Sequence, residues 1–92
     1  MPKVTIYTRS WCPYCHRALA LLESKGVEAE VIDVERTEGA LAEMLERSAG
    51  AATVPQIFIG ERHVGGCDDL VALDRNGRLD PLLEDGESGP GG

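Results

Sequence analysis

The sequence has 92 residues, of which 42% are hydrophobic, and its 16 acidic and 9 basic residues give a formal net charge of −7. This length suits one small domain, and the acidic balance argues against a nucleic acid as the main partner. No apolar run approaches the roughly 20 residues that cross a bilayer, and the N-terminus lacks the segments of a signal peptide. We therefore expect a cytoplasmic monomer without a membrane partner.

Hydrophobic periodicity and turn residues divide the chain into alternating strands and helices. The predicted elements are a strand at residues 3–8, a helix at 13–25 that stops at Gly26, a strand at 27–34, a helix at 38–48, a hairpin at 56–59 and 62–65, and a helix at 67–75. The order βαβαββα predicts an α/β fold, in which a four-stranded mixed sheet is flanked by helices.

The C-terminal residues are predicted to add little structure. A short final turn is expected to hold Leu82 and Leu83 against the core, so that the domain spans residues 1–84. Residues 85–92 are rich in glycine and have no apolar side chain to anchor them, which predicts a flexible tail.

Two cysteines, Cys12 and Cys15, lie where the first strand gives way to the first helix. A thiol at a helix N-terminus faces free backbone N–H groups and the positive end of the helix dipole. Both stabilise the thiolate, which is the nucleophilic form. Pro13 suits the first helical turn, where its missing N–H costs nothing. The spacing therefore favours redox chemistry, with Cys12 as the reactive sulfur.

The distribution of charge supports this interpretation. Residues 1–22 contain no Asp or Glu, whereas Lys3, Arg9 and Arg17 lie in that stretch of an otherwise acidic chain. A locally positive segment would stabilise a thiolate and attract a small anionic thiol. The alternative is that the surface charges fell this way by chance, since short basic segments are common.

The three cysteines also allow other chemistry. Cys12 to His16 matches the CxxCH string of haem attachment, which would require export from the cytosol. A zinc or iron–sulfur module could use Cys12, Cys15 and Cys67 together with a histidine. We expect instead that Cys67 is a small buried hydrophobic residue and that no metal is bound.

Thr53, Val54 and Pro55 precede the predicted hairpin. The simpler interpretation of Pro55 is a strand-entry proline, because proline cannot donate to a sheet ladder. The functional interpretation is a cis proline that faces the two cysteines and leaves the Val54 backbone free to pair with an extended ligand.

The segment from Gly65 to Asp69 closes the hairpin and opens the third helix. Its two glycines permit close backbone approach, and Asp68 is expected at the N-cap or in the first turn. Exposed N–H groups at this helix start could bind a carboxylate while Asp68 binds an ammonium group. An amino-acid-like head group carries both charges.

These motifs together resemble those of the glutaredoxins, and in particular the small bacterial dithiol type similar to glutaredoxin 3. The resemblance covers residues 1 to about 84 and implies a thioredoxin-like fold. It is carried by residues 6–8, 12–18, 53–59, 65–70 and 79–83, in order and at the family's spacing.

The resemblance implies glutathione-dependent reduction of protein–glutathione mixed disulfides and of protein disulfides, with glutathione as cosubstrate and no bound cofactor. Cys12 would attack and Cys15 would resolve the mixed disulfide. The implied glutathione contacts are Arg9, Tyr14, Thr53, Val54, Pro55, Gly66, Cys67 and Asp68. Arg9 would attract the glycyl carboxylate, for which Arg47 is an alternative.

Glutathionylated or disulfide-containing proteins, ribonucleotide reductase among them, are the protein substrates that the resemblance suggests. The nearest rival is a redoxin-type donor reduced by thioredoxin reductase. That group resembles glutaredoxins in fold but usually lacks a counterpart of Gly65 to Asp69, so glutathione is the expected reductant.

Overall fold

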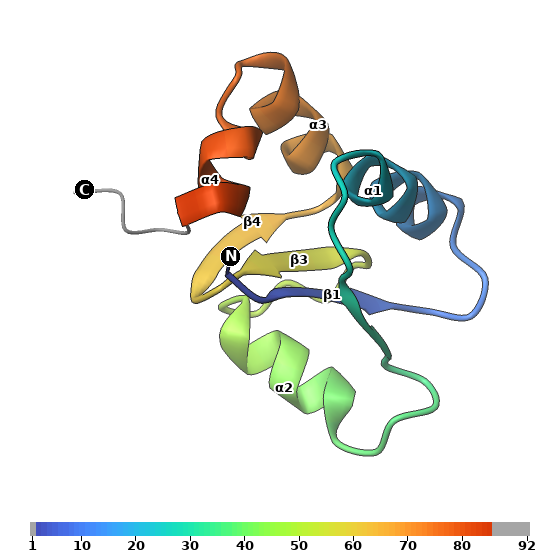
Figure 1. Ribbon diagram of the computed structural model, residues 1–92. Helices are drawn as coiled ribbons and strands as arrows, with labels where there is room; N and C mark the ends of the chain where they lie inside the picture. Colours follow the sequence, from blue (N-terminus) through green and yellow to red (C-terminus); the bar gives the residue numbers. More distant parts are fainter. Residues whose placement is uncertain (1, 86–92) are drawn as a thin grey trace.

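The computed structural model describes residues 2–85, in which strands and helices alternate until a β-hairpin and two helices follow (Figure 1). The elements are β1 (Val4–Thr8), α1 (Pro13–Ser24), β2 (Glu30–Asp33), α2 (Ala40–Arg47), β3 (Gln56–Ile59), β4 (Arg62–Gly65), α3 (Cys67–Arg75) and α4 (Leu79–Asp85).

The strands form one four-stranded sheet in the order β2-β1-β3-β4. β1 pairs in parallel with β2 and antiparallel with β3, and β3 pairs antiparallel with β4. The predicted mixed sheet is therefore confirmed. All five residues of β1 are buried, as expected for a central strand that helices cover on both faces.

Helices α1, α3 and α4 cover one face of the sheet and α2 covers the other (Figure 1). Alternate residues of β1 face the two layers, because successive side chains of a strand point to opposite sides. Val4 and Ile6 join the core under α1, α3 and α4. Tyr7 joins Met44 and Phe58 in the core under α2.

The largest difference from the predicted strand and helix boundaries lies at the start of β2. β2 begins at Glu30 and not at residue 27, because the preceding segment ends α1: the N–H groups of Gly26 and Val27 donate to carbonyls of that helix. Gly26 has a φ of 77°, the left-handed conformation that commonly ends a helix. Residues 27–29 then carry the chain from the end of α1 to the position beside β1 where β2 begins.

The predicted final turn is a seven-residue helix, α4. It buries Leu79 and Leu83 in the core below α1 and α3, with Leu82 packed against them. Lys25 at the end of α1 forms ion pairs with Asp74 of α3 and with Asp80 of α4. The element order is therefore βαβαββαα. The rest of the predicted tail, residues 86–92, lies outside the described residues.

Within residues 2–85, no helix has the length and apolar character needed to span a membrane.

A bulge in the β3–β4 hairpin sets the position of the start of α3. Phe58 pairs with His63, but Ile57 pairs with Gly65, so Val64 is an extra residue on β4. The bulge shifts the chain after Val64 by one residue. Gly65 then has a φ of 114°, and Gly66 lies beside Pro55, where an added Cβ would be in ordinary contact with the Pro55 carbonyl oxygen at 3.5 Å.

We predict that Gly65→Ala destabilises the protein by about 1–3 kcal/mol, because an L-residue is strained at this φ. Its Cβ would also overlap the Asp69 carboxylate, lying 2.9 Å from Cγ. Gly77→Ala is the control, since Gly77 also has a positive φ but has open space around it. Thermal unfolding of both variants measures the difference. A loss in Gly65→Ala no larger than that in Gly77→Ala would contradict the steric argument.

Candidate functional site

Cys12 is the N-cap residue of α1, as its position in the sequence predicts. Its backbone is extended, with φ of −151°, and its sulfur accepts a hydrogen bond from the Cys15 backbone N–H at 3.2 Å. Pro13 occupies the first turn. A sulfur in this position lies at the positive end of the helix dipole and receives a backbone N–H, and both interactions favour the thiolate over the thiol.

Cys15 lies one turn further along α1 and is buried, with 3% of its surface exposed. Burial, followed by the hydrogen bond to Cys12, raises the pKa of the Cys15 thiol to about 12. Cys15 therefore stays protonated at neutral pH while Cys12 carries the reactive sulfur. The two residues share a motif, but Cys12 lies at the N-cap whereas Cys15 lies inside the helix.

Cys67 is buried against the core under α1 and α3, as predicted. Burial raises the pKa of its thiol as well. All three cysteines are free thiols in this structure.

The Val54–Pro55 peptide bond is cis, which confirms that prediction. The Val54 carbonyl oxygen lies 4.0 Å from Cys12 Sγ. Beside this contact is a hollow of about 160 Å³ lined by Tyr14, Thr53, Val54, Pro55, Gly66, Cys67 and Asp68. Seven of the eight predicted glutathione contacts thus come together from α1, the β3 approach and the start of α3.

The start of α3 separates the roles of two neighbouring aspartates. Gly66 is the N-cap residue, and its N–H donates to Asp69 Oδ2 at 2.9 Å. Asp68 is in the first turn, is exposed and lines the hollow. Asp69 therefore performs the local capping, and the Asp68 carboxylate is available to a ligand.

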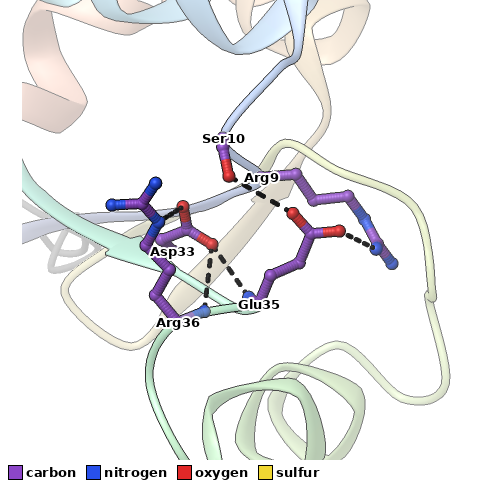
Figure 2. A network of polar contacts seen from close by, with 5 residues as sticks. All are labelled: Arg9, Ser10, Asp33, Glu35 and Arg36. Carbon is purple, nitrogen blue, oxygen red and sulfur yellow. Dashed lines mark hydrogen bonds and ion pairs between the residues drawn. The ribbon is translucent and has the colours of Figure 1, made fainter.

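Arg9 is the predicted contact that does not line the hollow. Figure 2 shows its guanidinium directed to Glu35, and Nη1 lies 3.2 Å from Glu35 Oε2. The other oxygen of Glu35 accepts from Ser10 Oγ at 3.4 Å. Asp33 holds the Glu35 backbone through a 2.8 Å hydrogen bond. The loop before Cys12 is thereby fastened to the loop after β2.

This pairing also changes the electrostatics expected from the sequence. Lys3 pairs with Glu30 and Arg9 pairs with Glu35, so two of the three cations near Cys12 in sequence are neutralised by carboxylates far along the chain. Among the ion pairs of the described residues, none involves Arg17. Arg17 is exposed on α1.

Arg47, the alternative for the glycyl carboxylate, is an exposed residue of α2 whose side chain contacts two residues of the core under that helix. Its Nη1 donates to the Tyr7 hydroxyl at 3.0 Å, and its guanidinium lies 4.2 Å from the centre of the Phe58 ring. The Tyr7 hydroxyl in turn donates to Glu43. These contacts give Arg47 a structural role in docking α2 on the sheet.

Two residues near the hollow were not singled out by sequence reasoning. Gln56 is a buried amide that donates to Thr53, and His63 on β4 contacts Gln56. His63 is exposed. The contact between them crosses the bulged hairpin, and no local pattern marks it.

Among residues 2–85, no group of three or more His, Cys, Asp or Glu side chains is arranged to hold a metal ion.

Comparisons with known proteins identify a family for this arrangement. A family model described as Glutaredoxin matches residues 4–64. Glutaredoxin 3 of Escherichia coli is 56% identical over 84 residues, which cover 91% of this chain and 100% of that protein.

Two solved structures extend the comparison. The solution structure of glutaredoxin from Brucella melitensis has a TM-score of 0.81 and 59% identity, covering 95% of this chain and 94% of that one. The crystal structure of a buckwheat glutaredoxin–glutathione complex has a TM-score of 0.82 and 30% identity, covering 91% of this chain and 78% of that one. The expected thioredoxin-like fold is therefore confirmed.

We predict that iodoacetamide at pH 8 modifies the folded, reduced protein at Cys12 alone. Cys15 is buried and its pKa of about 12 keeps it protonated, and the buried Cys67 also has a raised pKa. Peptide mass mapping locates the modification, and the urea-unfolded protein, in which all three thiols react, is the control. Comparable modification of Cys15 in the folded protein would contradict the assigned environments.

Proposed function

This chain belongs to the glutaredoxin family, of the small bacterial type similar to glutaredoxin 3, and we propose that it reduces protein–glutathione mixed disulfides and protein disulfides with glutathione as cosubstrate. The observation that carries the proposal is the Cys12 sulfur at the start of α1 beside the hollow. This arrangement places a nucleophilic thiolate next to a surface that can hold the glutathione half of a mixed disulfide.

In the proposed binding mode, the glutathione half lies along the Thr53–Pro55 wall of the hollow (Thr53, Val54 and Pro55). Its γ-glutamyl end would meet the start of α3, where the exposed N–H groups suit the carboxylate and Asp68 suits the ammonium group. Tyr14 is 56% exposed and would flank the ligand. Arg9 would have to leave Glu35 before it could bind the glycyl carboxylate.

For a glutathionylated protein, the Cys12 thiolate attacks the glutathione sulfur. The Cys12–glutathione disulfide forms as the original disulfide breaks, and the protein sulfur leaves as a thiolate that takes a proton from solvent. The thiolate of a second glutathione then attacks the glutathione sulfur of this intermediate. Oxidised glutathione leaves and the Cys12 thiolate is restored. Both steps are thiol–disulfide exchanges, in which the rate depends on thiolate fraction and on leaving-group pKa.

For a protein disulfide, Cys12 forms a mixed disulfide with the substrate, and Cys15 then attacks the Cys12 sulfur. The reduced substrate leaves and a Cys12–Cys15 disulfide remains, which two glutathione molecules reduce. The contact with Cys12 is part of what raises the pKa of Cys15. When Cys12 enters a disulfide its negative charge is lost, so the Cys15 pKa falls and the resolving thiolate forms more readily.

Ribonucleotide reductase and glutathionylated proteins are the proposed substrates, and the proposed state is a cytoplasmic monomer without a bound cofactor. Glutathione keeps thiols reduced in the cytoplasm, which suits the proposed chemistry.

We predict that Cys12→Ser abolishes turnover of a glutathione mixed disulfide, whereas Cys15→Ser retains most of it. Glutathione itself can resolve the Cys12 intermediate, but reduction of a protein disulfide needs Cys15. The assay supplies glutathione with glutathione reductase in one arm and thioredoxin reductase alone in the other. Turnover only in the thioredoxin reductase arm would reject the proposal. Equal inactivity of the two variants toward the mixed disulfide would reject the assigned cysteine roles.

We predict that Asp68→Ala raises the KM for a glutathione mixed disulfide by roughly tenfold to hundredfold, because a charged hydrogen bond is worth about 1.5–3 kcal/mol. Its melting temperature should stay near that of the parent. Asp69→Ala is the matched control: it removes the acceptor of the Gly66 N–H and should cost about 1 kcal/mol of stability, with the smaller effect on KM. A larger rise in KM for Asp69→Ala than for Asp68→Ala would contradict the assignment of Asp68 as a ligand contact.

A further inference from the structure

Gln56 connects strand β4 to the Thr53–Pro55 wall. Only 4% of its surface is exposed. Its Nε2 lies 3.0 Å from the Thr53 carbonyl oxygen and 3.3 Å from Thr53 Oγ1. At the other end of the amide, Oε1 lies 2.6 Å from Nε2 of His63. Both ends of this buried amide are therefore engaged.

The chemistry of these groups fixes the direction of each hydrogen bond. The Thr53 carbonyl can only accept, so the amide nitrogen of Gln56 must face it. The amide oxygen consequently faces His63, whose Nε2 must carry the hydrogen and donate. The order of donation runs from His63 to Gln56 and from Gln56 to Thr53.

His63 is itself held in place by packing. It is paired with Phe58 across the hairpin, and its ring stacks on the Phe58 ring with centroids 4.8 Å apart and planes 24° apart. Phe58 is 1% exposed and also lies against the Arg47 guanidinium. This packing restricts the position of the imidazole ring, so that its hydrogen bond can orient Gln56.

We propose that His63 is a positioning residue for the glutathione site, acting through Gln56 on the Thr53–Pro55 wall. Thr53 begins this wall, and Val54 follows with its carbonyl oxygen 4.0 Å from the Cys12 sulfur. Fixing the Thr53 carbonyl limits rotation of the chain that must pair with the ligand. The inference rests on the proposed function, because the wall has a ligand to position only if a glutathione half binds there.

The test variant is His63→Phe, which keeps an aromatic ring on Phe58 but removes the N–H donor. We expect the KM for a glutathione mixed disulfide to rise about threefold to tenfold, in keeping with one lost hydrogen bond. The kcat should remain within about twofold, and the rate at which iodoacetamide alkylates Cys12 should not change, since that reagent is too small to need the wall. His63→Gln keeps an N–H donor, so its KM should lie closer to that of the parent protein than the KM of His63→Phe does.

Arg62→Ala is the matched control, because Arg62 is exposed on the same strand and next to His63. A KM unchanged in His63→Phe, or raised equally in Arg62→Ala, would overturn the inference. If His63→Phe does not fold, His63→Ala takes its place with the same readouts. If the parent protein turns over the mixed disulfide and His63→Phe has the same KM, the positioning role alone is rejected. A parent protein without turnover rejects the proposed function and the positioning role with it.

Discussion

The hydrogen bond from the Cys15 backbone N–H to the Cys12 sulfur is the interaction on which the candidate site depends. It requires Cys12 to stand at the N-cap with an extended backbone, so the chain must leave β1 and turn into α1 within a few residues. β1 is the buried centre of the sheet, which makes the starting point of that turn rigid. Cys15 follows one turn into α1 and is the more deeply buried of the two, with 3% of its surface exposed against 8% for Cys12.

The remaining surfaces of the site come from the β3–β4 hairpin and the segments that flank it. Val64 is an extra residue in β4, and the start of α3 that follows it lies beside Pro55, the residue after the cis peptide bond. The hairpin also returns His63 to the vicinity of Gln56. One irregular hairpin therefore brings both walls of the hollow together, and it does so from the side of the sheet opposite β2.

The sequence predicts those features that depend on local patterns. The hairpin of β3 and β4, the apolar spacing of α3 and the placement of Cys12 at a helix start all follow from neighbouring residues. The Arg9–Glu35 pair does not, because its partners are 26 residues apart and surface charges carry no pattern that reveals pairing. The capping role of Asp69 was missed in favour of Asp68, since a cap depends on where the helix begins to within one residue. The Gln56–His63 contact depends on the hairpin register and on packing against Phe58, and local periodicity reports neither.

Trp11 precedes the Cys12 sulfur by one residue and has 84% of its surface exposed. It is also the single tryptophan of the chain. A disulfide accepts an electron from a nearby excited indole and so quenches its fluorescence. If the proposed Cys12–Cys15 disulfide forms, the emission of Trp11 would report the oxidation state, and a redox titration could be followed without an attached label.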